Sequence, residues 1–507
     1  MITNVLSYLE ASAAKHGDKP AFVSPDASLT FAQLAKKSQS AGTYFAKYTH
    51  VRTPIAFFTD KSPLCAAGFL GAVYAGCFYV LIDPKHPVAR QQAILKVLGA
   101  KLLVADSENL EKASSIGFDG EIISLEAACE ETKDGDLLAE IRAQSTDADP
   151  LYTNFTSGST GVPKGVLVSH RSVIDFISAF TEIFDITEND VIGNQAPFDF
   201  DVSVKDFYSG IFKGAAVYII PRKYFSFPTM LMDYLVTNNV TVLTWAVSAL
   251  CFVTTMRGLD YKIPHSVKKI IFSGEVMPVK HLNMWRKALP NALYANVYGP
   301  TEITCNCLYY ILDREFQDDE TLPLGKPFPN ETVFLLDEKD KLVTKADTKG
   351  EICVAGTCLA LGYYNDPART TKSFVQNPLN TAYPQTIYRT GDLAFYTKNG
   401  EMFYAGRKDF QIKHMGHRVE LGEIEHAAQN VKGVNRACCI YWEQKQRIIA
   451  FYDGTADKKV LAKALYELLP PFMLPNAVVQ KKALPMTKNG KIDRAALLNS
   501  YIEEKGK

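Results

Sequence analysis

Apolar and polar positions alternate along the first 330 residues in a pattern that predicts strands separated by helices. Short apolar runs rich in Val, Ile, Leu and Phe have the length of buried strands, and amphipathic stretches with helical spacing lie between them. These runs are 54–59, 78–83, 100–106, 216–221, 240–245 and 268–274. Such alternation is typical of α/β layers with mostly parallel sheets. We therefore expect a large N-terminal domain of two layered α/β sheets.

The pattern changes in the last third of the chain. Short strand-like segments separated by turn dipeptides predict a small antiparallel β unit over 330–405. A compact tail follows, whose own helical patterns lie at 420–429 and 460–469. The predicted fold class is therefore α/β, with residues 1–408 as the N-terminal domain, which includes the β unit, and residues 409–507 as a small α+β C-terminal domain.

Charge and composition exclude several classes of protein. The 507 residues include 55 basic and 55 acidic side chains, and this balance argues against a nucleic-acid-binding protein, which usually has a basic excess. No basic region precedes an apolar core at the N-terminus, and the longest apolar stretch, at 66–81, is too short to span a membrane. The ten cysteines follow no disulfide or zinc spacing, which suits a reducing compartment. We expect a cytoplasmic protein without a membrane or nucleic-acid partner.

One segment has the composition of a phosphate-binding loop. The sequence TSGSTGVPKG, at 156–165, places four hydroxyls and three glycines around a single lysine, directly after a strand-like run. Glycines let backbone N–H groups converge on an anion, hydroxyls donate further hydrogen bonds, and lysine adds a positive charge. The segment does not fit the Walker pattern, and a solvated Ser/Gly turn is the alternative.

This loop resembles the phosphate loop of the adenylate-forming superfamily, which includes acyl-CoA synthetases, luciferases and the adenylation domains of non-ribosomal peptide synthetases. Further signatures of that family follow in the expected order along nearly the whole chain. They are LTFAQL (29–34), NQAPFDFDVS (194–203), NVYGPTE (296–302), GEICVAG (350–356) with LGYYNDPART (361–370), YRTGDLA (388–394), GRKDFQIKHMGHRVELGEIE (406–425), LPPFMLP (469–475) and TKNGKIDR (487–494). GHRVELGEIE and NGKIDR look like the amino-acid-activating branch, and NQAPFDFD, GEVMP and DFQIK look most like the D-alanine–D-alanyl carrier protein ligases.

The resemblance implies an ATP site with Mg²⁺. It implies that the loop over the β- and γ-phosphates is formed by Thr156, Ser157, Gly158, Ser159, Thr160 and Lys164. It also implies that Thr301 binds the α-phosphate, Glu302 holds Mg²⁺, Asn296 and Tyr298 bind adenine, and Asp392 accepts the ribose hydroxyls, with Arg407 nearby. Without the resemblance, Glu302 would be interpreted as a surface carboxylate and Asp392 as a turn residue.

The resemblance also assigns a role to the C-terminal domain. Lys491 matches the lysine that bridges the substrate carboxylate and the α-phosphate; its alternative is a solvated charge at a turn tip. Because Lys491 lies in the small domain, that domain is expected to act as a mobile lid. Asp409 matches the hinge, and rotation there would exchange Lys491 for the Gly416 loop.

A second set of positions matches the family's substrate pocket. They are Asp201, Val202, Lys205, Thr244, Ile271, Ser273, Val297, Cys305 and Asn306. Asp201 matches the carboxylate that pairs with the α-ammonium of an amino acid, and a plain strand-end aspartate is the alternative. Ser273 departs from the D-alanine ligases, which have a cysteine there. Lys205 replaces a typically apolar residue, and it either extends to solvent or pairs with a polar or anionic substrate side chain.

The leading hypothesis is an ATP-dependent ligase that forms aminoacyl-AMP, releases pyrophosphate and transfers the aminoacyl group to the phosphopantetheine thiol of a carrier protein. No carrier motif follows Lys491, so the carrier is expected in trans, and Lys408, Lys413, His414, His417 and Arg418 would supply charge complementary to it. The alternatives are an acid–CoA ligase for an amine-free organic acid, a D-alanine ligase of the lipoteichoic acid pathway, and a non-catalytic homologue.

Overall fold

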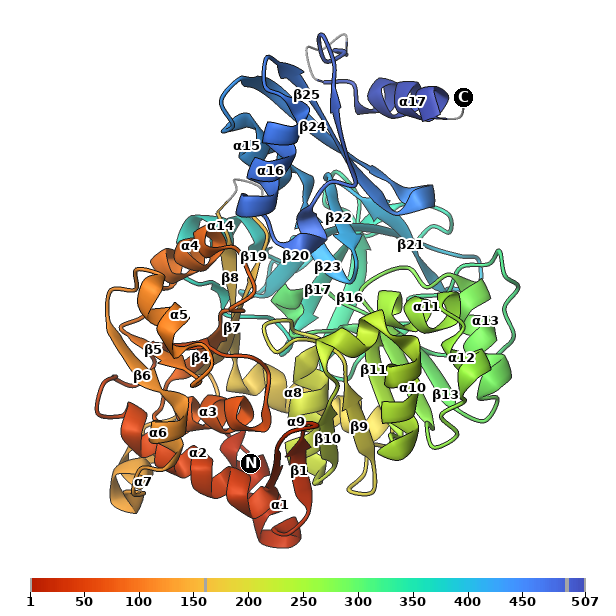
Figure 1. Ribbon diagram of the computed structural model, residues 1–507. Coiled ribbons are helices and arrows are strands. Elements are labelled where there is room, and N and C mark those ends of the chain that lie inside the picture. The colour runs from red at the N-terminus through yellow and green to blue at the C-terminus, as the bar shows by residue number, and fades with distance from the viewer. Residues whose placement is uncertain (1, 159–161, 488–491, 506–507) are drawn as a thin grey trace. The chain divides into compact units, whose positions relative to one another are not determined.

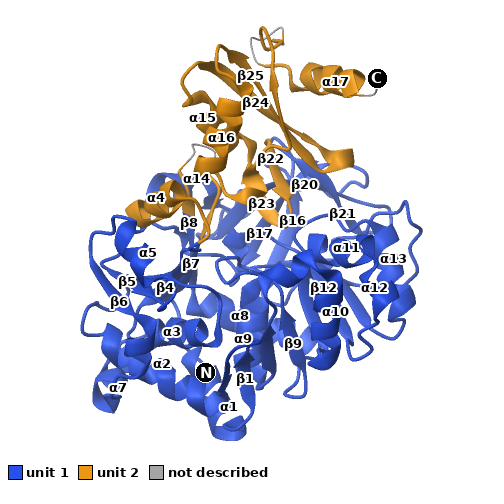
Figure 2. Ribbon diagram, viewed as in Figure 1, with its two compact units in different colours: residues 1–84, 98–154, 165–408 blue, residues 85–97, 155–164, 409–507 orange. Residues whose placement is uncertain are grey.

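The computed structural model describes residues 2–158, 162–487 and 492–505. The chain divides into two compact units, which Figure 2 shows in separate colours. Unit 1 comprises 1–84, 98–154 and 165–408, and unit 2 comprises 85–97, 155–164 and 409–507. No helix in the described part of the chain is both long enough and apolar enough to cross a bilayer.

Two large sheets form the centre of unit 1 (Figure 1). The first has seven strands in the order β18 (Gly362–Tyr363), β8 (Lys164–Ser169), β7 (Pro150–Thr156), β4 (Phe78–Leu81), β3 (Pro54–Phe58), β5 (Leu102–Ala105) and β6 (Glu121–Ser124). The second has nine, in the order β15 (Lys326–Pro327), β14 (Leu308–Ile311), β13 (Leu293–Tyr298), β12 (Lys269–Ser273), β11 (Val242–Ala246), β9 (Val191–Asn194), β10 (Ala216–Ile219), β1 (Pro20–Val23) and β2 (Ser28–Thr30). Most neighbouring strands are parallel, which confirms the predicted α/β class.

Helices connect and cover these sheets because parallel neighbours need crossover connections. Those of unit 1 are α1 (Leu6–His16), α2 (Phe31–Phe45), α3 (Pro63–Tyr74), α5 (Leu110–Ser115), α6 (Leu125–Cys129), α7 (Gly135–Ala143), α8 (His170–Ile183), α9 (Ser203–Lys213), α10 (Pro228–Thr237), α11 (Val247–Thr255), α12 (Gly258–Tyr261), α13 (Val279–Ala288), α14 (Pro367–Ser373), η1 (Arg222–Ser226) and η2 (Thr301–Ile303). Helix α2 begins with a capping box, in which Thr30 accepts from the Gln33 N–H and the Gln33 side chain accepts from the Thr30 N–H.

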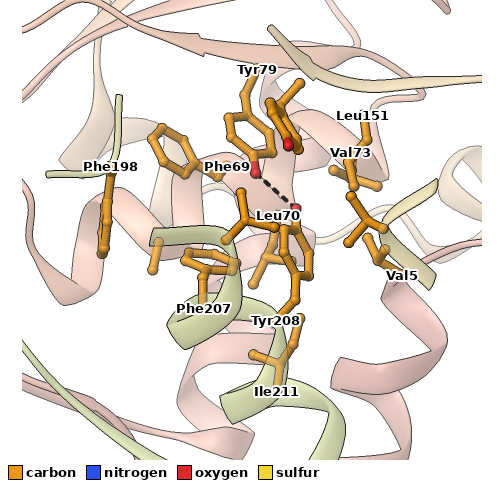
Figure 3. Packing of buried hydrophobic residues seen from close by; sticks show 14 of the residues in the cluster. Val5, Phe69, Leu70, Val73, Tyr79, Leu151, Phe198, Phe207, Tyr208 and Ile211 are labelled. Atoms are coloured by element: carbon orange, nitrogen blue, oxygen red, sulfur yellow. Dashed lines mark hydrogen bonds between the residues drawn. The ribbon is translucent and has the colours of Figure 1, made fainter. Parts of the chain in front are cut away.

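One apolar core joins both sheets. Buried side chains of β3 and β5, in the seven-stranded sheet, belong to the same apolar cluster as those of β9, β10 and β12, in the nine-stranded sheet. Helices α2, α3, α8 and α9 also contribute buried side chains to this cluster. In its centre Phe69 of α3 stacks on Tyr79 with ring centroids 4.3 Å apart, and the Tyr79 and Tyr208 hydroxyls share a 2.9 Å hydrogen bond (Figure 3). Because this pairing satisfies two buried hydroxyls, α9 has a fixed position against the sheets.

The remaining elements of unit 1 form the predicted antiparallel β unit. Its strands are β16 (Glu331–Leu336), β17 (Gly350–Gly356), β19 (Phe374–Gln376), β20 (Thr386–Tyr396) and β21 (Met402–Arg407). Strand β20 pairs with three of the others, and its register places Asp392 opposite Arg407.

Unit 2 has its own small sheets and core. Its elements are α4 (Val88–Leu98), β22 (Gln411–His414), β23 (His417–Glu420), α15 (Leu421–Gln429), β24 (Val434–Trp442), η3 (Glu443–Lys445), β25 (Arg447–Gly454), α16 (Lys458–Leu468), η4 (Pro471–Met473), β26 (Ala477–Gln480) and α17 (Arg494–Lys505). Side chains of α15, α16 and the β24–β25–β26 sheet pack into one cluster.

All ten cysteines are free thiols, and nine of them are buried, so they act as small apolar side chains.

A buried carboxyl at the start of β16 makes stability depend on pH. Burial, together with the charge of Asp175, raises the pKa of Glu331 to about 9, and its Oε2 has no hydrogen-bond partner among the described residues. The folded protein therefore holds a proton that the unfolded chain releases above its ordinary pKa. Stability should fall as pH rises between these two values.

We expect Glu331→Gln to keep the shape of this side chain and to remove the titration. The variant should unfold at a higher temperature than the wild type at about pH 8, while the two proteins should differ little at about pH 5. Glu338→Gln, an exposed site on the loop after β16, is the matched control. Parallel unfolding of wild type and Glu331→Gln across this pH range would refute the burial argument.

Candidate functional site

The carboxyl ends of the parallel strands β9, β11, β12 and β13 lie at one edge of the nine-stranded sheet. In open α/β sheets, ligands bind outside this edge. Ser273 is the last residue of β12, and Asn296, Val297 and Tyr298 end β13. Several of the predicted site residues are thus placed at a favourable edge by sheet topology alone.

The predicted pocket residues are all buried in unit 1. They are Asp201, Val202, Lys205, Thr244, Ile271, Ser273, Val297, Cys305 and Asn306. The Cys305 thiol donates to the Asp201 carbonyl oxygen at 2.9 Å, which joins the segment before α9 to the segment after η2. Ile271 and Val297 belong to the large apolar cluster.

The backbone is strained where the chain positions the pocket residues Cys305 and Asn306. Thr304 and Cys305 have φ angles of 55° and 75°, in the left-handed region that non-glycine residues seldom adopt. The Thr304 hydroxyl donates to the Cys358 carbonyl oxygen at 2.8 Å, which helps to hold this conformation. Backbone strain of this kind is concentrated at functional sites in proteins. It sets the direction of Cys305 and Asn306.

Lys205 does not reach solvent. Its side chain is buried on α9 with 1% of the residue exposed, and its Nζ donates to Ser273 Oγ at 3.2 Å and to Asn306 Oδ1 at 3.0 Å. Burial lowers the pKa of Lys205, while Cys305, Asp206 and Asp201 act in the opposite direction. Of the two alternatives for this lysine, the structure excludes extension to solvent.

Asp206 is a site residue that sequence reasoning missed. Its carboxylate accepts hydrogen bonds from the Thr244 hydroxyl and, at 2.9 Å, from Asn194 Nδ2. Burial raises the pKa of Asp206 to about 6, although these hydrogen bonds and Lys205 act against the rise. The Thr244 hydroxyl therefore binds Asp206. Position 206 follows Lys205 directly, but no local pattern identifies its partners.

Three of the predicted ribose and adenine residues, Tyr298, Asp392 and Arg407, contact one another in unit 1. Arg407 Nη1 lies 2.6 Å from Asp392 Oδ1, and the Tyr298 hydroxyl donates to Asp392 Oδ2. Asp392 and Arg407 are opposite each other on β20 and β21, so strand register creates this pair. Burial, and then the charge of Asp392, raises the pKa of Tyr298, so its hydroxyl stays protonated and remains a donor. Asn296 Nδ2 donates to the Pro323 carbonyl oxygen at 2.9 Å.

Thr301 and Glu302 open the single turn η2, directly after β13. Both are buried, and Glu302 Oε1 accepts a 2.7 Å hydrogen bond from the Tyr363 hydroxyl. A buried carboxylate with one oxygen oriented in this way fits Mg²⁺, which commonly binds one or two carboxylates together with phosphate oxygens. Glu302 is the residue of the predicted set that would hold this ion.

The described part of the predicted phosphate loop lies in unit 2. Ser157 Oγ donates to the Arg418 carbonyl oxygen at 2.8 Å, and the Gly158 N–H donates to Glu423 Oε2 at 3.2 Å. Glu423 Oε1 in turn accepts from Arg90 Nη1 at 3.0 Å, in a pair whose side chains are 7% and 6% exposed. The Glu423 carboxylate thus accepts a hydrogen bond from the Gly158 N–H, a backbone donor of the loop.

Arg90 and Glu423 were not among the residues predicted from the sequence. Glu423 lies within the quoted GHRVELGEIE segment, where it has the spacing of an ordinary helix residue, and nothing around Arg90 marked it. Of the remaining loop residues, Thr156 and Lys164 are described, and Lys164 is buried at the start of β8. Ser159, Thr160 and Lys491 lie outside the described residues. The two compact units divide between Lys408 and Asp409. Asp409 Oδ1 accepts a hydrogen bond from the Gln411 N–H at 3.2 Å. The role of Asp409 as a hinge stays a prediction.

We expect Asp392→Asn to raise the KM for ATP by roughly 10- to 100-fold, because a charge-assisted hydrogen bond becomes a neutral one. The change should also lower the free energy of unfolding, since Arg407 loses its carboxylate partner in a buried setting. Asp340→Asn is the matched control, because Asp340 pairs with Arg389 at 2.8 Å while its side chain is 49% exposed. An unchanged KM for ATP in Asp392→Asn would remove this residue from the nucleotide site.

Known proteins resemble this chain over almost its full length. The family model described as AMP-binding enzyme matches residues 9–364. Zwittermicin A synthase ZmaJ of Bacillus cereus is 31% identical over 98% of this chain and 95% of its own length. Tyrocidine synthase 1 of Brevibacillus parabrevis is 31% identical over 96% of this chain, which spans 44% of that protein.

A solved structure has the same fold. The Vibrio cholerae adenylation domain AlmE, in complex with glycyl-adenosine-5′-phosphate, superimposes with a TM-score of 0.85 and 20% identity, over 99% of this chain and 98% of that one. At this identity the likeness establishes the fold alone. The family match, the full-length relative and the two-sheet architecture together confirm the resemblance found in the sequence. The chain belongs to the AMP-binding enzyme family, and it is an AMP-forming ligase of the adenylate-forming superfamily.

Proposed function

We propose that this protein activates an amino acid with ATP, forming aminoacyl-AMP and pyrophosphate. The observation that carries the proposal is Asp201, a carboxylate on a residue that is only 6% exposed, in the segment that joins the carboxyl end of β9 to α9. A carboxylate buried at a pocket wall favours a ligand of opposite charge. The α-ammonium of an amino acid supplies that charge, whereas an amine-free acid would bring only a second negative charge to this wall.

Different residues of unit 1 would bind the amino acid, the α-phosphate and the ribose in this reaction. Asp201 would hold the α-ammonium, and Thr301 would donate to the α-phosphate that the substrate carboxylate attacks. The carboxylate oxygen forms a bond to the α-phosphorus while the bond to the leaving pyrophosphate breaks. Asp392, oriented by Arg407 and Tyr298, would accept the ribose hydroxyls. Fixing both reactants in this way accounts for much of the acceleration in such a displacement.

Charge stabilisation would supply the remainder of the acceleration. Mg²⁺ held by Glu302 would neutralise charge on the phosphate oxygens. The loop residues Thr156 to Lys164 would cover the β- and γ-phosphates, and Lys491 would bridge the substrate carboxylate and the α-phosphate. By the family resemblance, rotation of residues 409–507 about Asp409 would follow adenylation. The aminoacyl group would then pass to the phosphopantetheine thiol of a separate carrier protein.

Pyrophosphate exchange into ATP over a panel of L- and D-amino acids, aryl acids and fatty acids tests the proposal. We expect at least one amino acid to stimulate exchange well above the blank without substrate, and amine-free acids to give none. If aryl or fatty acids alone stimulate exchange, the amino-acid assignment is wrong. If D-alanine exceeds every other amino acid, the D-alanine ligase alternative is correct. Loading of a phosphopantetheinylated carrier, measured against free coenzyme A, tests the second step.

A further inference from the structure

The cluster around Lys205 contains more hydrogen-bond donors than acceptors. The Lys205 ammonium has three N–H donors, and two of them bind Ser273 Oγ and Asn306 Oδ1. Asn306 uses its oxygen for this contact, and its NH₂ group donates to no other group in the described residues. The Ser273 hydroxyl likewise accepts from Lys205 and donates to no described acceptor. The three residues are 1%, 2% and 3% exposed.

The cluster also contains a positive charge without an ion pair. Across the described ranges, no carboxylate oxygen lies within 4.0 Å of Lys205 Nζ. Asp206 is the neighbouring residue on α9, but its two oxygens bind Thr244 and Asn194. Asp201 is the group that the proposed function assigns to the α-ammonium. A buried ammonium in this setting carries a desolvation cost that its two neutral acceptors, together with the more distant charges of Asp206 and Asp201, only partly offset.

We propose that the amino acid activated by this enzyme has a side chain ending in a carboxylate, and that Lys205, Ser273 and Asn306 bind that carboxylate. This inference rests on the proposed function and names its substrate class. A carboxylate has two oxygens and accepts only, so it complements the remaining N–H of Lys205, the NH₂ of Asn306 and the Ser273 hydroxyl. The acidic side chain and the α-ammonium then pair with Lys205 and Asp201 respectively.

The pocket discriminates against other side chains for the same reason. An apolar side chain would leave the ammonium and the amide donors buried and unpaired, which costs far more than a missing methylene group. A cationic side chain would meet Lys205 as a like charge. An amide such as asparagine presents one acceptor, but its own NH₂ would face a cluster made mostly of donors. Aspartate and glutamate are therefore expected to exceed their amides.

The test compares the wild type with Lys205→Met, which keeps the length of the side chain and removes its charge. In pyrophosphate exchange, wild type should use aspartate or glutamate with a higher kcat/KM than asparagine, glutamine or leucine. In Lys205→Met, the value for the acidic substrate should fall about a hundredfold or more, and the preference should shift to the amide or to leucine. Lys213→Met, at the other end of α9, is the matched control and should keep the wild-type ranking.

Two outcomes separate this inference from the proposed function. If no amino acid supports exchange in the wild type, the proposed function fails, and the inference fails with it. If the wild type prefers an apolar or cationic amino acid, or Lys205→Met leaves the ranking unchanged, only the inference is wrong. A melting temperature of Lys205→Met at or above that of the wild type shows that the variant folds, because an apolar isostere replaces a buried charge. Should it fail to fold, Asn306→Leu, which removes the amide donors, must weaken the preference for the acid.

Discussion

Asp201→Asn is expected to lower kcat/KM for the amino-acid substrate by a factor corresponding to about 3–5 kcal/mol, a few hundredfold or more. Asn keeps the volume of Asp201, and the Cys305 thiol contacts the backbone oxygen of this residue, so the pocket should keep its shape. What disappears is the negative charge opposite the α-ammonium. Steady-state pyrophosphate exchange, with the amino acid varied at saturating ATP, measures the effect.

The control for Asp201→Asn is a change of substrate. The deamino analogue of the preferred amino acid lacks the α-ammonium, so the wild type should use it poorly and the variant should use it no worse. If both compounds lose the same factor, Asp201 supports the structure of the pocket and does not bind the amine. If neither loses activity, the amino-acid assignment itself is wrong.

Lys491→Ala is expected to lose adenylation by about 10²- to 10³-fold, as when one donor to a developing charge is removed. It should lose far less of the second half-reaction, the transfer from preformed aminoacyl-AMP to the carrier thiol, because by the family resemblance the Gly416 loop would replace Lys491 there. Rapid-quench measurement of each half-reaction separates the two effects.

Lys488→Ala is the matched control for this variant, since it removes a lysine three residues away in the same TKNGKIDR segment. Both half-reactions should stay near wild-type rates in that protein. Equal losses of both half-reactions in Lys491→Ala would contradict the alternation of the C-terminal domain about Asp409.

The sequence predicted the strands well because local pattern determines them. The apolar runs at 54–59 and 268–274 contain β3 (Pro54–Phe58) and β12 (Lys269–Ser273), and the change of pattern after residue 330 marks the antiparallel unit. Each run is continuous, rich in β-branched or aromatic residues and bounded by polar or turn residues, so its neighbours in sequence carry the signal.

The contacts that shape the site could not be predicted in this way. Arg90 and Glu423 pair across 333 positions, and Lys205 reaches Ser273 and Asn306 across 68 and 101. No local periodicity constrains such distances. The sequence left two alternatives for Lys205 because a lysine stem reaches solvent from many pocket walls. The structure excludes extension to solvent, because Lys205 is buried and its ammonium contacts Ser273 at the end of β12 and Asn306 after the strained turn at Thr304 and Cys305.

Adenylation requires that a substrate carboxylate oxygen attack the α-phosphorus of ATP. An amino acid labelled with ¹⁸O in its α-carboxylate tests this step in a single turnover with the carrier or with water. When the acyl carbon leaves the adenylate, one labelled oxygen should remain on the phosphate, so mass spectrometry should find a single ¹⁸O in AMP and none in pyrophosphate. Label in inorganic phosphate with formation of ADP, or AMP without label, would contradict adenylation.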